Sequence, residues 1–222
     1  AATAVGLLGL AGQGVGTTGN GELDYGLAFT GDGRLWLSSD TTSNLWEVNP
    51  ANGMTRWVGS LGAPISGLAA SGNQLYGVST GGDDSLYRID RDTAVSTRIG
   101  SLGLADPMYD AGLDFDAQGR LWVTIDYFSP PTGIPPLRND VAQLDLSTGR
   151  RLETRIITGA GTDVDTAQME GLAIAPPAVR GGGDGTVVPP PPPAPIPGPA
   201  LPALALLALI AAFFGWRRLR AA

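Results

Sequence analysis

The sequence predicts an all-β chain built from one repeated unit of four short antiparallel strands. A Gly-Leu pair begins each unit and recurs at intervals of 41, 45 and 59 residues. Between these pairs lie short runs rich in aromatic and β-branched residues, which favour strands. Gly, Asn and Asp bound the runs about every 8–12 residues, the spacing of turns between short strands.

The predicted strands fall into four equivalent sets, which we letter a to d in chain order. Strands a cover 26–30, 67–70 and 112–115; strands b cover 34–38, 74–78 and 120–124; strands c cover 44–48, 85–89 and 141–145; strands d cover 55–59, 97–100 and 154–157. A four-stranded antiparallel unit of this length is one blade of a β-propeller.

Both ends of this region carry fragments of further units. Residues 3–10 match a strand d without the other three strands, and residues 171–175 match a strand a with nothing after it. We therefore expect three full blades and two partial ones within a propeller domain of residues 1–175. We also expect residues upstream of Ala1, including a signal peptide.

The composition excludes several classes of site. All basic residues are Arg, and there is no His and no Cys. A Ser-His-Asp triad, a cysteine nucleophile, a Schiff-base lysine, an imidazole zinc site and a disulfide framework are therefore excluded. Only oxygen ligands remain for a metal, which favours calcium or magnesium. The sequence contains no basic patch of the kind that would indicate nucleic-acid binding.

The last 47 residues have a different composition. A glycine-rich stretch at 181–185 is followed by eight prolines within 189–199, which predicts an extended spacer of roughly 34 Å over those eleven residues. Residues 200–216 are then apolar, with Arg217, Arg218 and Arg220 after them. We predict a linker at 176–199 and a transmembrane helix with a cytoplasmic Arg-rich end at 200–222. The alternative is a buried core helix.

Two resemblances accompany these patterns. The tail resembles the PEP-CTERM and IPTL-CTERM sorting signals of Gram-negative envelope proteins through Ile196-Pro197, the apolar span and Arg217-Arg218. It departs from the IPTL-CTERM signal at Gly198-Pro199, where that signal has Thr-Leu, and it lacks the Glu of the PEP-CTERM signal. This resemblance implies an exosortase-like sorting protease, an inner-membrane helix and a periplasmic or extracellular body. Residues 22–175 resemble NHL and YVTN propeller repeats.

Acidic residues gather at one end of the predicted blades. In a four-stranded antiparallel blade the b–c loops and d–a connections share one end, here called the loop end, and the a–b and c–d turns share the other, the turn end. The loop end holds Glu22, Asp24, Asp40, Asp83, Asp84, Asp106, Asp110, Asp126, Asp140, Asp163, Asp165 and Glu170, with Arg138 as its arginine. Such a face attracts cations.

This acidic face has two interpretations. In the first, separate loops supply oxygen ligands for calcium, the candidates being Asp24, Asp110, Glu170, Asp83, Asp84, Asp163 and Asp165. In the second, the acids form turns and a solvated surface. A proline-rich insertion at 127–138 lies at the same end. Its residues Tyr127, Phe128 and Arg138 are candidates for binding a partner, and the alternative is a loop that covers a blade edge.

The function favoured by these patterns is a non-catalytic, envelope-anchored propeller that presents its acidic face to a protein, a polysaccharide or calcium. The alternative is a calcium-dependent hydrolase of the gluconolactonase-like or phytase-like propeller kind, whose metal is held by carboxylates. Ile65-Ser66 interrupts the acidic ring in the second blade, which weighs against the hydrolase.

Overall fold

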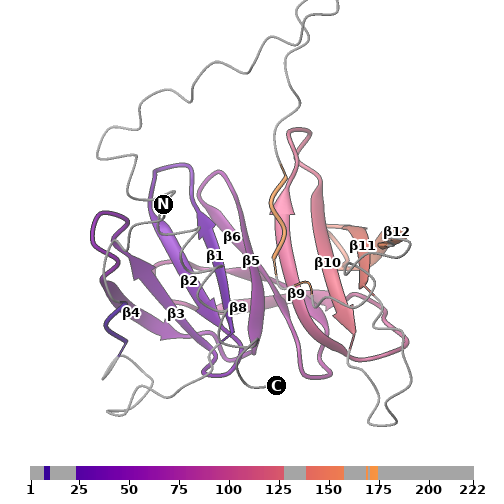
Figure 1. The fold of residues 1–222 in the computed structure, drawn as a ribbon, viewed down its shortest axis with the longest axis horizontal. Helices are drawn as coiled ribbons and strands as arrows, with labels where there is room; N and C mark the ends of the chain where they lie inside the picture. The colour runs from indigo at the N-terminus through magenta and orange to yellow at the C-terminus, as the bar shows by residue number, and fades with distance from the viewer. Residues whose placement is uncertain (1–7, 11–23, 128–138, 158–168, 170, 175–222) are drawn as a thin grey trace, which may run out of the picture.

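The computed structural model describes residues 8–10, 24–127, 139–157, 169 and 171–174. These residues form three four-stranded antiparallel sheets, each with its strands in chain order (Figure 1). The strands are β1 (Tyr25–Phe29), β2 (Leu35–Ser39), β3 (Asn44–Val48), β4 (Thr55–Ser60), β5 (Ile65–Ser71), β6 (Gln74–Ser79), β7 (Ser85–Ile89), β8 (Ser96–Ser101), β9 (Met108–Phe115), β10 (Leu121–Tyr127), β11 (Asn139–Leu144) and β12 (Arg151–Ile157). The three predicted blades are confirmed, and we call them blades 1 to 3.

Blade 3 extends further toward the loop end than the sequence predicts. Its strand a begins at Met108 instead of 112, and its strand b runs to Tyr127 instead of 124. The apolar alternation ends near Thr124, but the ladder continues because Asp126 pairs with Asp110 on one side and with Asn139 on the other. Polar residues carry these last rungs, so hydrophobic patterning does not reveal them.

The innermost strands β1, β5 and β9 pack side by side through glycine. A Cβ on Gly26 would overlap the backbone at 66–68 of β5, and a Cβ on Gly67 would lie 2.9 Å from the Ala111 carbonyl oxygen of β9. Strand backbones this close leave no room for a side chain, which explains the glycine at the start of each unit.

A fourth innermost segment continues this series at 171–174. A Cβ on Gly112 would overlap the backbone at 171–172, and the Ile174 amide donates to Asp114 Oδ2 at 2.7 Å. Residue 171 therefore lies beside 112 and residue 174 beside 114, so the segment runs parallel to β9 (orange, Figure 1). This is the position that the sequence predicts for a further strand a.

Residues 8–10 contact blade 1 in the same way as the residues after β8 of blade 2 contact blade 3. The Leu8 carbonyl accepts hydrogen bonds from the backbone and hydroxyl of Thr55 in β4, and the equivalent carbonyl of Leu102 accepts from Arg151 in β12. Gly9, like Gly103, has a positive φ, 63° against 69°, a conformation that favours glycine. This geometry agrees with the match of residues 3–10 to a strand d.

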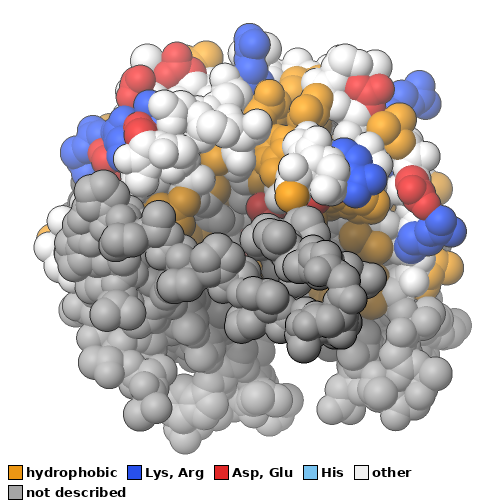
Figure 2. Space-filling view, turned by 90° about the horizontal axis from the view of Figure 1, so that it is seen from above, with side chains coloured by type: hydrophobic (Ala, Val, Ile, Leu, Met, Phe, Trp, Pro, Cys, Tyr) orange, Lys and Arg blue, Asp and Glu red, His pale blue; other side chains and the backbone are white. Residues whose placement is uncertain are grey.

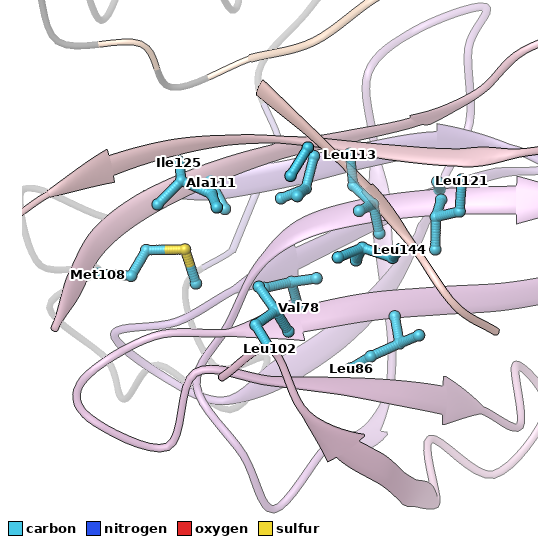
Figure 3. Packing of buried hydrophobic residues seen from close by; sticks show 12 residues of the cluster. Val78, Leu86, Leu102, Met108, Ala111, Leu113, Leu121, Ile125 and Leu144 are labelled. Atoms are coloured by element: carbon cyan, nitrogen blue, oxygen red, sulfur yellow. The ribbon is translucent and has the colours of Figure 1, made fainter. Parts of the chain in front are cut away.

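The core lies between the blades. One buried cluster joins β6–β8 of blade 2 to β9–β11 of blade 3, with Val78, Leu86 and Leu102 facing Leu113 and Leu144 (Figure 3). A second cluster joins blades 1 and 2 and contains Trp36. Burial of large apolar side chains is the main force holding such layers together.

The described residues contain no helix that is long and apolar enough to cross a membrane. The predicted linker at 176–199 and the predicted transmembrane segment at 200–222, with Ile196, Pro197, Arg217, Arg218 and Arg220, lie outside the described residues.

Candidate functional site

The loop end brings together acidic residues from all three blades. Those the structure describes are Asp24, Asp40, Asp83, Asp84, Asp106, Asp110, Asp126 and Asp140. The other acids predicted for this end (Glu22, Asp163, Asp165 and Glu170) lie outside the described residues, as do Phe128 and Arg138 of the insertion.

Asp83 is held inside blade 2 by its own strands. Its carboxylate accepts hydrogen bonds from Ser79 Oγ at 2.6 Å and Tyr87 OH at 2.7 Å, and Arg98 Nε lies 3.4 Å away. Burial raises the pKa of Asp83, but the hydrogen bonds from Ser79, Tyr87 and Ser85 outweigh burial and hold that pKa below its usual value. Asp83 is therefore a stable anion at neutral pH.

The neighbouring Asp84 faces a different surface. It is buried against blade 3, where its Oδ2 accepts from the Met108 amide at 3.4 Å. Its backbone has a positive φ of 42°, and burial raises the pKa of its carboxyl group. Asp83 and Asp84 therefore take part in separate networks, although they are adjacent in sequence.

A third set of polar side chains lies at the loop end of blade 3. Asp126 is the cross-strand partner of both Asp110 and Asn139, and these three residues are 1%, 4% and 2% exposed. Sequence reasoning selected Asp110 alone as a candidate ligand. The signal that could have found Asp126 and Asn139 was strand pairing, because both follow from extending the ladder by two rungs.

Asp140 lies on the opposite face of blade 3 from this set. It pairs with Ile125 in the ladder, and Tyr127 OH donates to its Oδ2 at 2.9 Å. Tyr127, predicted as part of a partner-binding loop, thus supports the blade through its hydroxyl group.

The strand-a acids do not form a closed ring among the described residues. Asp24 and Asp110 each lie two residues before the glycine of their inner strand, but the equivalent residue of β5 is the fully buried Ile65. The described residues contain no group of three or more acidic side chains close enough to hold a metal ion.

The innermost strands also line a cavity of about 270 Å³. Leu27 and Phe29 of β1, Leu68 of β5, and Leu113 and Asp114 of β9 contribute to its wall. Both Asp114 oxygens accept backbone hydrogen bonds, one from Phe115 and one from Ile174. The carboxylate in this apolar wall therefore holds the segment 171–174 in place.

No family model matches this chain, and no curated protein matches it. Among solved structures it is similar to the hydrazine synthase of Kuenenia stuttgartiensis (20% identity, TM-score 0.44, 60% of this chain and 36% of that chain). It is also similar to the Dos1 propeller (19%, TM-score 0.38, 58% and 34%).

A third similar structure is a virginiamycin B lyase from Staphylococcus aureus with quinupristin (12%, TM-score 0.42, 66% and 59%). The chain spans less than two thirds of each of these structures. These likenesses concern β-propeller proteins and carry no inference about activity.

Proposed function

We propose that this protein is a non-catalytic β-propeller binding module anchored in the cell envelope, with the loop end as its binding face. The observation that carries this proposal is the separation of the carboxylates at that end. Asp83, Asp84 and Asp140 each accept hydrogen bonds within their own part of the fold. These three acids thus help to build the blades and do not converge on one reaction centre.

The charge of the loop end determines which partners suit it. Asp40 is half-buried and Asp106 exposed, in two different connections, and Asp83 is ionised because hydrogen bonds hold its pKa below the usual value. A surface of this sign attracts cationic groups and repels phosphate. We therefore propose a partner that presents positive charge, either on a protein or as calcium bridging to a polysaccharide.

The anchor is proposed from the tail. Residues 200–216 are a continuous apolar stretch followed by Arg217, Arg218 and Arg220. By the positive-inside rule, this pattern supports arginines in the cytoplasm and a body outside it. An exosortase-like protease would be the partner that processes the tail. Fractionation of cells that express the full chain should place it in the inner-membrane fraction before any cleavage.

One observation favours the alternative of a calcium-dependent hydrolase. Asp110 and Asp126 are cross-strand partners and almost fully buried. Two neighbouring carboxylates on one face of a sheet attract a divalent cation.

A hydrolysis assay with calcium separates the two functions, and melting in a calcium titration shows whether calcium binds. Saturation at 100 times the dissociation constant would stabilise the chain by about 2.7 kcal/mol, and magnesium is the control cation. Asp110→Asn with Asp126→Asn tests the buried pair, and Asp40→Asn with Asp106→Asn is the matched surface pair. Hydrolysis of a lactone or of phytate that needs calcium and is lost in the buried double variant would overturn the non-catalytic proposal. Calcium stabilisation without turnover would support it.

A further inference from the structure

The two ends of the blades differ in charge. Among the described residues of the turn end, arginines and carboxylates are equal in number: Arg34, Arg56, Arg88, Arg91, Arg120, Arg150 and Arg151 against Asp32, Glu47, Asp90, Asp92, Asp114, Asp116 and Asp145. Several of them are ion pairs, such as Arg91–Asp32 at 2.7 Å and Arg56–Glu47 at 2.6 Å. The loop end carries the described acids named above, with Arg98 as the arginine paired there.

The turn end also exposes apolar side chains at its tips. Met54, Val95 and Leu146 each lie in a c–d turn, one from each blade, and are 52%, 60% and 37% exposed. Phe29, at the end of β1, is exposed to a similar degree. Figure 2 looks onto this end and shows acidic and arginine side chains around the edge with apolar side chains between them.

The last described segment of the chain reaches this same end. The segment 171–174 runs parallel to β9, and β9 runs from the loop end toward the a–b turn at 116–120. The segment 171–174 therefore reaches the turn end with Ile174, beside the innermost strand β9 (orange trace, Figure 1). Every residue of the proposed linker and anchor follows Ile174 in the chain, so the attachment begins at the turn end.

We propose that the turn end is the membrane-facing surface of the body, with Met54, Val95 and Leu146 touching the interface of an anionic bilayer, and that the acidic loop end faces away from it. This inference rests on the anchor proposed above. The turn end has no net charge among its described residues, so an anionic bilayer does not repel it, and its exposed apolar side chains suit the headgroup region of such a bilayer. The loop end is repelled by the same surface, because its net charge is negative. The position of the segment 171–174 and the negative charge of the loop end thus favour the same orientation of the body.

The absence of cysteine from the whole chain makes this orientation measurable. The full chain would be reconstituted into vesicles that contain phosphatidylglycerol, with single cysteines introduced by Met54→Cys, Val95→Cys, Asp106→Cys or Ile156→Cys. Asp106 is an exposed residue of the loop end, and Ile156 is 60% exposed on β12, away from the turn tips. Each cysteine would carry a fluorophore, and lipids with a nitroxide in the headgroup region would quench it.

The labels at positions 54 and 95 should lose most of their fluorescence, and those at 106 and 156 should keep most of it. Equal quenching at all four positions, or stronger quenching at 106, would overturn the orientation and leave the anchor intact. Failure of the chain to float with the vesicles would overturn the anchor, and the orientation with it. Met54→Asp with Val95→Asp should abolish quenching of a label introduced by Leu146→Cys without preventing flotation.

Discussion

At the scale of single residues, the blades need glycine at different positions for two different physical reasons. Gly67 is buried where β5 meets β9, and a larger side chain there would strike the Ala111 carbonyl and the Leu113 side chain. Gly72 has open space around it but a positive φ of 57°. The first position is restricted by packing and the second by backbone conformation.

Gly67→Val should therefore cost more than Gly72→Ala. Overpacking at 67 forces two inner strands apart and should lower the free energy of unfolding by about 3 kcal/mol or more. Alanine at 72 must adopt a left-handed conformation, which should cost about 1 kcal/mol. Urea unfolding of both variants is the measurement, and equal midpoints would contradict the packing of β5 against β9.

A second residue-scale prediction concerns Glu47, which accepts hydrogen bonds from Arg34 at 2.7 Å and Arg56 at 2.6 Å. The hydrogen bond from Arg34 is the main cause that lowers the pKa of Glu47 from 4.5 to about 2. A carboxyl group whose folded pKa is depressed stabilises the fold above its unfolded pKa, and this contribution is lost as the pH falls through the folded pKa.

Glu47→Gln should therefore destabilise the protein by about 1 kcal/mol at neutral pH, since solvent screens part of the interaction. The difference in melting temperature between variant and parent should shrink as the pH falls from 4.5 toward 2. Glu153→Gln is the matched control, because Glu153 and its partner Arg155 are both well exposed. A pH-independent loss in Glu47→Gln would rule out the ion pair as its cause.

At the scale of elements, the strands of blades 1 and 2 follow closely from the sequence. Their apolar alternation, as in 44–48 and 85–89, coincides with the strand that forms, and β3 and β7 have the predicted bounds. Blade 3 departs because its last rungs are Asp110, Asp126 and Asn139. Burial of these polar groups depends on neighbouring strands distant in sequence, so local patterning could not predict it.

The segment 171–174 is held against β9 by a hydrogen bond to one side chain. Asp114 holds it through the Ile174 amide, whereas the equivalent residues of β1 and β5 are Ala28 and Ala69. Asp114→Ala should remove about 1 kcal/mol of hydrogen-bond stabilisation, and so speed amide exchange of Ile174 about 5-fold. Asp145→Ala, which removes the carboxylate of the 145–150 turn, should leave that rate unchanged. Unchanged exchange in Asp114→Ala would show that Asp114 does not hold the segment.

At the scale of the whole molecule, the sequence predicts an acidic loop end, and the structure describes eight of its twelve predicted acids, which come from all three blades. The sequence could not predict how the candidate site divides. Asp83 and Asp84 are adjacent in the chain but accept side-chain and backbone hydrogen bonds from different blades, while Asp110 and Asp126 are distant in the chain but paired. Side-chain direction at a turn with positive φ, and strand register, decide these neighbours.

The boundary between body and tail supports a last prediction. Hydrogen bonding of Ile174 to Asp114 makes residue 174 part of the packed body. The sequence after it is rich in Gly and Pro, with few large apolar side chains before 200, a composition that predicts a linker. Limited proteolysis of the full chain should therefore release a compact fragment that ends near Pro177, identified by its mass. Asp114→Ala should increase the share of fragments that end before Gly171, because the segment opens about 5-fold more often. A protected fragment that retains 181–199 would mean that the linker packs on the body. The turn end would then be covered by the chain's own residues, and its exposed tips could not meet a bilayer.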